Sequence, residues 1–360
     1  MIVYWSMFLS VSVCALVLGP RAASLAYGMQ SARLNSGWVL VWLVLTLLIG
    51  YRFEVGGDWG TYLRHLQEAR YQDINSAVAK GDPAYRLLNL LAVKLGWGIS
   101  GVNVVSASLF SAGLVYFCRG LPRPWLALAA AIPYMVTVVA MGYTRQSVAL
   151  GLAMLGLVAL ARQANLWFVF WVLCAAAFHK SAVLLLPIAA LAATNNRYWT
   201  ALWIAVATAL AYVVFLQDSV DTLYINYVEA RYQSEGAFVR AAMNLVPACI
   251  YLVLGRRFHM QAGEARLWLW FAIISIALFV GVIATPATTA VDRIALYMLP
   301  LQLVVFSYLP EVLGTRGRRN TGFTCLVLLY YATVLFVWLN YATHAFAWLP
   351  YRFYPIEAWF

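Results

Sequence analysis

The dominant pattern along the chain is a series of long apolar runs separated by short polar segments. A helix that crosses a bilayer needs ~20 mostly apolar residues, with about 17–25 as the usual range. The sequence therefore predicts an all-α, polytopic integral membrane protein that forms a single membrane domain over residues 1–360. About twelve spans are expected, at residues 2–19, 36–50, 101–118, 124–141, 145–162, 164–178, 181–194, 198–216, 240–255, 266–286, 291–310 and 321–341.

The composition supports a membrane location. Hydrophobic residues make up 64% of the chain and charged residues 10%, whereas a soluble domain carries about 25% charged residues. So few charges cannot cover the surface of a soluble protein of 360 residues. An ordinary soluble enzyme is thereby excluded.

The charges also predict an orientation. If the twelve spans alternate in direction, one set of connecting loops carries 12 basic residues and two acids, a balance of +10, and the other set has a balance of +1. Loops rich in Lys and Arg stay in the cytoplasm, so we expect both termini on the outer side. This bias explains the net charge of +11 without nucleic acid as a partner.

Two outer loops are long. In the first, about 51–100, the apolar residues of Tyr85–Gly96 recur at helical spacing, which predicts an amphipathic helix in the membrane interface. The second, about 217–240, contains Tyr224, Tyr227 and Tyr232. These tyrosines suit either a sugar-contacting cover or an ordinary interfacial aromatic belt.

Four charged clusters return to the outer side. They are YRFEVGGDWGTY at Tyr51–Tyr62, GYTRQ at Gly142–Gln146, FHK at Phe178–Lys180, and the pair Asp292-Arg293. An ionisable residue at the mouth of a span is costly to desolvate, so it usually faces a water-filled cavity or a partner. We expect the four clusters to form one polar site.

Arg52 and Arg145 most need an explanation, because each lies against a long apolar run. A guanidinium is a permanently charged planar fork that suits phosphate or carboxylate. Arg145 is therefore a candidate phosphate clamp. The alternatives are an ion pair with Asp58 or Asp292, or extension of the side chain to the interface.

The remaining candidates also have plainer interpretations. His179 could be a general base or a hydrogen-bonded structural residue, and Lys180 could bind phosphate or mark the interface. Arg293 shares a helix face with Tyr297; it could bind an anion or pair locally with Asp292. A carboxylate at Asp58 could orient or deprotonate a sugar hydroxyl.

No motif indicates a nucleotide or a resident metal. The five cysteines lie in or beside apolar runs without metal-ligand spacing. Walker A, HExxH, GxSxG and DxD patterns do not occur. Neither cofactor nor metal is expected, although Asp58 with Glu54 could hold a cation.

Taken in order, the clusters resemble the EpsG family of bacterial membrane proteins, which is grouped with Wzy-type exopolysaccharide and O-antigen polymerases. The resemblance covers roughly residues 40–310, and in one place the chain has Asp82 where Glu is commoner. It is carried by Arg52, Gly56 or Gly57, Asp58 and Tyr62, then Asp82-Pro83-Ala84-Tyr85, Arg145-Gln146-Ser147-Val148-Ala149, Phe178–Ala182, and Asp292-Arg293 with Tyr297.

The resemblance implies a fold like that of C-type membrane glycosyltransferases. It also implies a polymerase of undecaprenyl-pyrophosphate-linked oligosaccharide repeat units, working at the periplasmic face of the bacterial inner membrane. The partners would be this lipid-linked oligosaccharide, the growing polysaccharide and the bilayer, with a chain-length regulator as a further candidate. No nucleotide sugar is implied.

Each candidate then has a provisional role. Arg145 would act in catalysis and bind pyrophosphate with two further arginines, and Asp58 or His179 would serve as base or orient the acceptor. Substrate-binding candidates are Arg52, Arg293, Gln146, Lys180, Tyr62, Tyr297 and Asp292.

Three other functions compete with this one. A flippase for lipid-linked oligosaccharides should carry charges buried in mid-span, whereas the charges here lie at one face. A ligase that passes the polymer to lipid A core would use the same donor chemistry. A non-catalytic assembly subunit would leave the outer arginines without a purpose.

Overall fold

The computed structural model describes residues 1–20, 29, 35–79, 81–192, 197–215, 236–285 and 288–357. Within these ranges the chain is helical, and its sole strand-like feature is an isolated bridge between Arg52 and Phe353. Six helices are long and apolar enough to cross a membrane, so this is a multi-pass membrane protein. They are Gly98–Arg119 (α6), Thr144–Ala161 (α8), Ala237–Leu254 (α13, continued to Arg257), Ala262–Ala284 (α14), Val291–Leu313 and Thr321–Tyr341 (α17).

The other six predicted spans also coincide with apolar helices, but shorter ones. They are Ile2–Leu18 (α1), Ser36–Gly50 (α2), Pro124–Ala140, Asn165–Phe178 (α9), Lys180–Ala189 and Tyr198–Val213, the last within Arg197–Phe215 (α11). The helix positions predicted from the apolar runs are thus confirmed. That all twelve cross the bilayer stays a prediction.

Three of the spans change helix type along their length, beside prolines. Pro124–Ala131 (α7) continues as a π-helix, Ile132–Ala140, which contains Pro133. A 3₁₀ segment, Lys180–Leu185 (η3), precedes Leu186–Ala192 (α10), and Thr288–Ala295 (α15) passes through Leu296–Met298 (η7) into Pro300–Leu313 (α16). Proline lacks the N–H that a regular α-helix needs, which accounts for irregular hydrogen bonding at these points.

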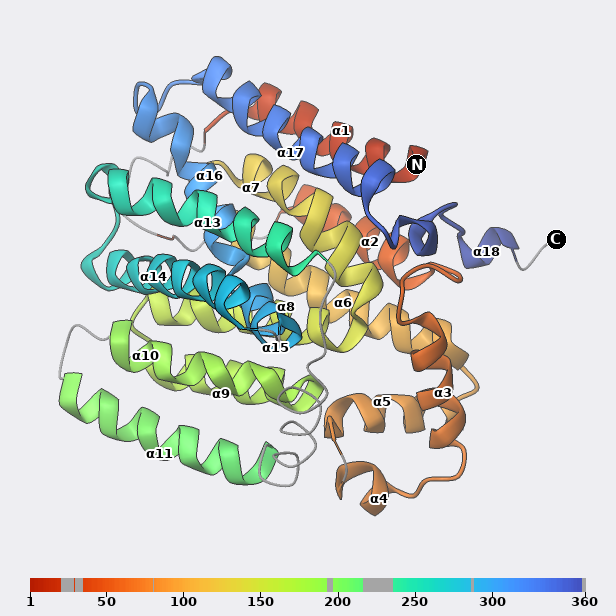
Figure 1. The fold of residues 1–360 in the computed structure, drawn as a ribbon. Helices are drawn as coiled ribbons and strands as arrows, with labels where there is room; N and C mark the ends of the chain where they lie inside the picture. The colour runs from red at the N-terminus through yellow and green to blue at the C-terminus, as the bar shows by residue number, and fades with distance from the viewer. Residues whose placement is uncertain are drawn as a thin grey trace.

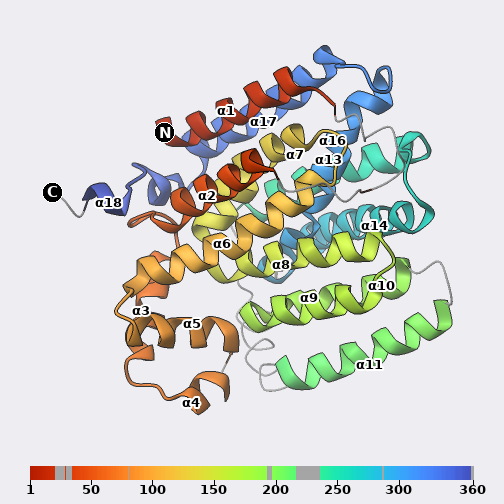
Figure 2. The ribbon, with the colours of Figure 1, turned by 180° about the vertical axis from the view of Figure 1, so that it is seen from behind.

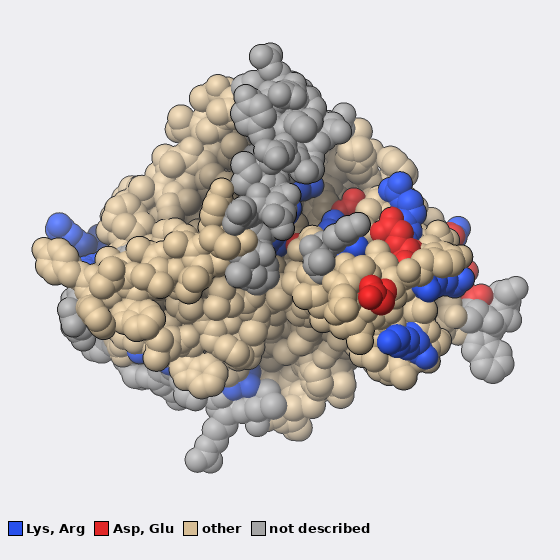
Figure 3. Space-filling model, turned by 90° about the horizontal axis from the view of Figure 1, so that it is seen from below, with Lys and Arg blue, Asp and Glu red and all other residues tan. Residues whose placement is uncertain are grey.

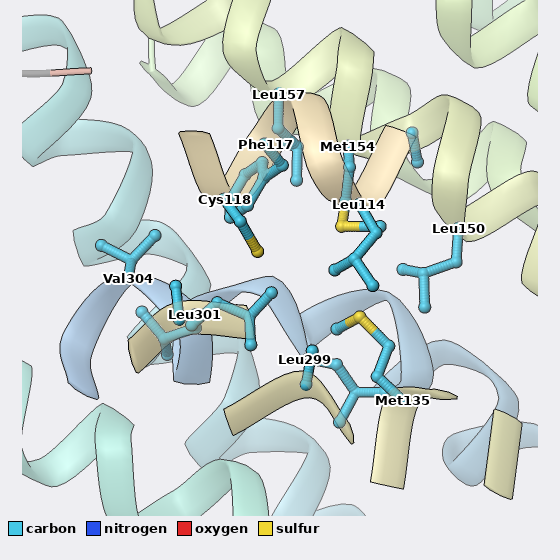
Figure 4. Packing of buried hydrophobic residues seen from close by; sticks show 14 of the residues in the cluster. Leu114, Phe117, Cys118, Met135, Leu150, Met154, Leu157, Leu299, Leu301 and Val304 are labelled. Carbon is cyan, nitrogen blue, oxygen red and sulfur yellow. The ribbon is translucent and has the colours of Figure 1, made fainter. Parts of the chain in front are cut away.

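The core forms where α6 crosses α8 at very short range. A Cβ on Gly113 would lie 2.0 Å from the backbone oxygen of Gly151, so the crossing requires glycine. Small residues at such crossings are typical of membrane helices, because they let two backbones pack closely. Around the crossing, Leu114, Met135, Met154 and Leu299 fill the interior (Figure 4).

The first long outer loop contains three helices: Trp59–Ala69 (α3), Ile74–Ala79 (α4) and Pro83–Lys94 (α5). They lie together at one end of the bundle, the end that also holds both termini (Figures 1 and 2). The helix predicted at Tyr85–Gly96 is confirmed as α5, whereas α3 and α4 were not predicted. The second outer loop, including Tyr224, Tyr227 and Tyr232, lies largely outside the described residues.

The chain that follows α17 binds the loop before α3. Phe53 N donates to Arg352 O at 3.0 Å, and Gly56 N donates to Ala347 O at 2.8 Å. Gly56 has φ +105°, and a Cβ there would lie 2.2 Å from Met141 O. The loop is therefore held between the C-terminal segment and the end of the π-helix.

Trp348 is the anchor of this C-terminal segment. It lies in the short helix Ala345–Trp348 (η8), is 2% exposed, and donates through Nε1 to Thr137 O in the π-helix at 2.7 Å. Its own carbonyl accepts a hydrogen bond from Tyr4 at 2.7 Å. Trp348 thus joins the C-terminal segment to α1 through its carbonyl and to the π-helix through its indole.

Trp348→Ala should destabilise the protein by about 3–5 kcal/mol, the usual cost of truncating a buried tryptophan. Phe346 lies two residues away but is 74% exposed, so Phe346→Ala is the matched control. Thermal unfolding in detergent should show a clearly lower midpoint for the Trp348 variant alone. Equal midpoints for the two variants would mean that the segment is not an anchor.

Candidate active site

A single buried carboxylate, outside the four sequence clusters, joins two of them. Asp82, which precedes α5 and is 4% exposed, accepts a hydrogen bond through Oδ2 from Arg145 Nη1 at 2.9 Å. Its Oδ1 accepts the backbone N–H of Lys180 at 3.1 Å. His179 Nδ1 lies 3.5 Å from Oδ2. The beginnings of α5 and α8 and the end of α9 therefore meet at Asp82.

These contacts set the charges of the group. Burial on its own would raise the pKa of Asp82, but the contacts with His179, Arg145 and the Lys180 N–H outweigh it and hold the pKa below its usual value. Burial lowers the pKa of His179, and the nearby charges of Arg145 and Arg293 act in the same direction. At neutral pH the pair is thus an ionised aspartate beside a neutral imidazole.

Arg145 is held by Asp82 without being enclosed. Its side chain is 32% exposed, against 5% for Asp82, and its guanidinium lies over the Tyr85 ring, 6.0 Å from the centroid. The surrounding aromatic wall includes Tyr62, whose ring centroid is 5.8 Å from that of Tyr85. Burial raises the pKa of Tyr62 to about 12, so its hydroxyl remains protonated.

A second carboxylate, Asp58, stands in a different environment. It is half-buried at the beginning of α3 and forms no side-chain cap to that helix. Burial raises its pKa, while Arg145 and Arg293 act in the opposite direction. Within the part of the chain that the structure describes, no group donates a hydrogen bond to this carboxylate. Asp58 is therefore an acid of raised pKa within electrostatic reach of two arginines.

Arg293 enters the site from α15, with an exposed side chain. Gln146 Nε2 donates to the Arg293 carbonyl at 2.8 Å, which ties α15 to the beginning of α8. A similar tie joins η3 to η7, where Ser181 Oγ and the Tyr297 hydroxyl lie 3.2 Å apart. These contacts place Arg293 and Arg145 on neighbouring elements.

The neighbouring Asp292 is occupied by another residue of the chain. Both of its carboxylate oxygens accept hydrogen bonds from Arg240 in α13, at 2.6 and 2.7 Å. The pair lies in a largely buried position. It fixes α15 to α13 and so supports the position of Arg293.

Arg52 is likewise engaged by the protein. It is 1% exposed and donates to Ile49 O at 2.7 Å, Thr144 Oγ1 at 2.7 Å and Asn103 Oδ1 at 3.3 Å. These acceptors belong to α2, α6 and α8. The arrangement gives Arg52 a positioning role beneath Arg145, which follows Thr144 directly.

The predicted clusters thus lie around one region, with Asp58, Arg145, His179, Lys180, Gln146, Arg293, Tyr62 and Tyr297 surrounding it. In Figure 3 the acidic residues gather with several basic ones on one side of the face, and elsewhere that face shows only a few scattered basic residues. Among the described residues no three His, Cys, Asp or Glu side chains form a metal-binding group.

Two residues central to this arrangement were assigned no role from the sequence. Asp82 looks like an ordinary helix cap before Pro83. Arg240 lies four residues inside an apolar helix, the same signal that drew attention to Arg145. The signal for Arg240 was therefore available, whereas the contacts of Asp82 depend on which helices pack together.

Comparison with known proteins gives one match. The model of a family described as the EpsG family matches residues 37–353, which is most of the chain. No curated protein and no solved structure matches.

The two aspartates should respond oppositely to substitution. The folded state raises the pKa of Asp58, so ionisation of this carboxyl opposes folding above its unfolded pKa. Asp58→Asn should therefore raise the unfolding temperature at neutral pH, and the gain should shrink as pH falls.

The folded state lowers the pKa of Asp82, so the stabilisation that the ionised Asp82 contributes is present above its unfolded pKa. Asp82→Ala should then cost about 3–5 kcal/mol, as removal of one partner of a buried ion pair does.

Thermal unfolding of both variants in detergent between pH 5 and 8 tests this pair of expectations. The control is Glu357→Ala, at an exposed position at the end of the short helix Tyr354–Glu357 (α18). Destabilisation by Asp58→Asn at pH 8 would contradict the interpretation that ionisation of Asp58 opposes folding.

Proposed function

Because the chain belongs to the EpsG family of Wzy-like polymerases, we propose that it polymerises undecaprenyl-pyrophosphate-linked oligosaccharide repeat units into exopolysaccharide, capsule or O-antigen. The reaction would take place at the periplasmic face of the inner membrane. An acceptor hydroxyl attacks the anomeric carbon of the donor sugar, and the bond from that carbon to the pyrophosphate oxygen breaks. The hydroxyl proton passes to a base, and polyprenyl pyrophosphate leaves.

The observation that carries this proposal is the position of Asp58 within reach of Arg145 and Arg293. Negative charge grows on the pyrophosphate as the glycosidic bond breaks, and donors placed where charge develops are often the largest catalytic contribution. Asp82 orients the Arg145 fork through one nitrogen, so the fork is preorganised to accept a phosphate group. Arg293 supplies the second cation.

Asp58 is the favoured base. Its raised pKa brings it nearer to the operating pH, which is the condition for efficient proton transfer. The alternative is His179, whose Nδ1 faces Asp82. A proton on Nδ1 would leave Nε2 as the acceptor of the hydroxyl proton.

The other candidates support these groups. Lys180 and Gln146 flank the phosphate-binding arginines, and the Tyr62 and Tyr297 hydroxyls are donors for sugar or phosphate oxygens. Arg52 and Asp292, predicted as substrate ligands, are assigned to positioning instead, because protein groups already bind their polar atoms.

The distribution of charge favours an enzyme over a flippase. In the described apolar helices every charged side chain lies close to a helix end, as with Arg145, Arg240 and Glu264. A flippase must present polar groups along the whole path through the membrane. A ligase would share the donor chemistry and differ in its acceptor, so the reaction product distinguishes it.

The direct test mixes purified protein in liposomes with a lipid-pyrophosphate-linked repeat unit and no nucleotide sugar. A ladder of repeat-unit multiples is expected on a gel. Arg145→Lys should reduce its rate by roughly 10²–10³-fold, the usual loss when a preorganised donor is removed, because an ammonium cannot replace a bidentate fork. The matched control is Arg64→Lys, at an exposed position of α3.

A variant Arg145→Lys with wild-type rate would remove Arg145 from the site. Movement of the lipid-linked unit across the bilayer without a ladder would identify a flippase. Transfer to a different acceptor with no ladder would identify a ligase.

The role of the base is tested by pH dependence. The kcat/KM of the wild type should fall as pH decreases through the raised pKa of Asp58, since only the ionised carboxylate accepts a proton. Asp58→Asn should lose about 10²–10⁴-fold in rate, the usual contribution of a general base, and should lack this acidic limb. If the limb survives in Asp58→Asn and disappears in His179→Gln, the histidine is the base.

A further inference from the structure

An apolar groove lies between α9 and α11, on the outside of the bundle. Its volume is about 720 Å³, and ten of its twelve lining residues are apolar. The walls include Leu166, Val169 and Leu173 from α9, and Trp203, Ala207 and Leu210 from α11. In a membrane this groove opens towards lipid, where it must be filled by a hydrocarbon chain.

The groove approaches the candidate active site, and its lining on α9 ends at Leu173. Leu173 precedes His179 by six residues of α9, a distance of about 9 Å along a helix axis. At the same end α11 packs against η3, the segment that begins with Lys180. Figure 1 shows α9 and α11 running side by side, with α11 at the edge of the bundle. A molecule with a charged head at Arg145 and Lys180 would therefore enter this apolar groove once its tail had passed about 9 Å along α9.

The dimensions suit a long-chain lipid. From Leu173 to Asn165 the α9 wall extends about 12 Å, and it begins about 9 Å from His179 along the helix, so a tail that fills it must cross more than one leaflet of a hydrocarbon core of about 30 Å. Trp199 and Trp203 stack edge to face, with ring centroids 6.3 Å apart, on the α11 wall. The two helices thus offer a long apolar wall that begins near the site and runs towards the opposite face of the bilayer.

We propose that the groove between α9 and α11 binds the polyprenyl tail of the donor whose pyrophosphate occupies the candidate active site. This inference rests on the proposed function for the identity of the donor. It adds the location of the tail and names α11 as a substrate-binding element. Binding the tail would fix the pyrophosphate beside Arg145 at lower entropic cost than capture of the head alone.

The binding test needs neither sugar nor turnover. Undecaprenyl pyrophosphate with a photoreactive diazirine in its tail is irradiated with the protein in liposomes of phosphatidylethanolamine and phosphatidylglycerol. Labelled peptides should come from α9 and α11, and unlabelled undecaprenyl pyrophosphate should abolish the labelling. Ala207→Trp, which fills the groove, should reduce labelling at least tenfold, whereas Ala205→Trp, at an exposed position of α11 outside the lining, should not.

Labelling confined to other helices would overturn the proposal. So would labelling of α9 and α11 that excess phosphatidylglycerol removes equally well, since the groove would then hold ordinary bilayer lipid. Labelling that persists in Ala207→Trp would also overturn it.

Measurements of KM with donors of different tail length provide a second test of the proposal. With a full-length undecaprenyl donor, Ala207→Trp should raise KM at least tenfold; with a farnesyl donor, whose tail is too short to fill the groove, KM should be unchanged. Equal changes for both donors would contradict tail binding. If labelling of α9 and α11 succeeds but no ladder forms with any donor, the proposed polymerase activity is contradicted. The proposal that the groove binds the polyprenyl tail is then still supported.

Discussion

The site depends on the buried carboxylate of Asp82. A buried charge is costly unless it is paired and hydrogen-bonded, and Asp82 meets this condition only when α5, α8 and the end of α9 are assembled. Arg145 supplies the opposite charge, and the Lys180 N–H binds the second oxygen. The same contacts that satisfy Asp82 aim Arg145 into the site. The interaction between Asp82 and Arg145 therefore both stabilises the fold and positions Arg145.

Asp82 and Asp58 suit different roles because their surroundings differ. Asp82 is fully engaged and stays ionised, which suits an orienting group. Asp58 accepts no hydrogen bond from the described residues, and its pKa is raised, which suits proton transfer. A similar separation of carboxyl pKa values by environment marks acid and base roles in many enzymes. The assignment of Asp58 as base follows from this contrast more than from either residue alone.

Much of the fold could be predicted from the sequence, because the length of an apolar run is a local property. Every predicted span coincides with a helix, and α5 was located by its periodicity. The site was predictable only in outline, since the order of clusters does not say which side chains touch. Asp82 was noted only as part of the family resemblance, Arg52 was predicted to be a substrate ligand, and Arg240 was assigned no role. Each outcome depends on tertiary packing: Arg52 is surrounded by acceptors from three helices, and Asp292 faces Arg240 across α13 and α15.

The helices differ in how deeply they are buried, and this difference suits a rigid site that binds an exchangeable lipid. The hydrophobic windows of α8 and of Val291–Leu313 are each 83% buried, and these two elements carry Arg145 and Arg293. By contrast, α11 lies at the edge of the bundle and exposes Leu202, Trp203 and Leu210. Groups that must hold a transition state need a rigid surround, whereas a lipid that enters and leaves at each cycle needs access from the bilayer. Placing Arg145 and Arg293 on largely buried helices and the groove beside an exposed one meets both needs in a single chain.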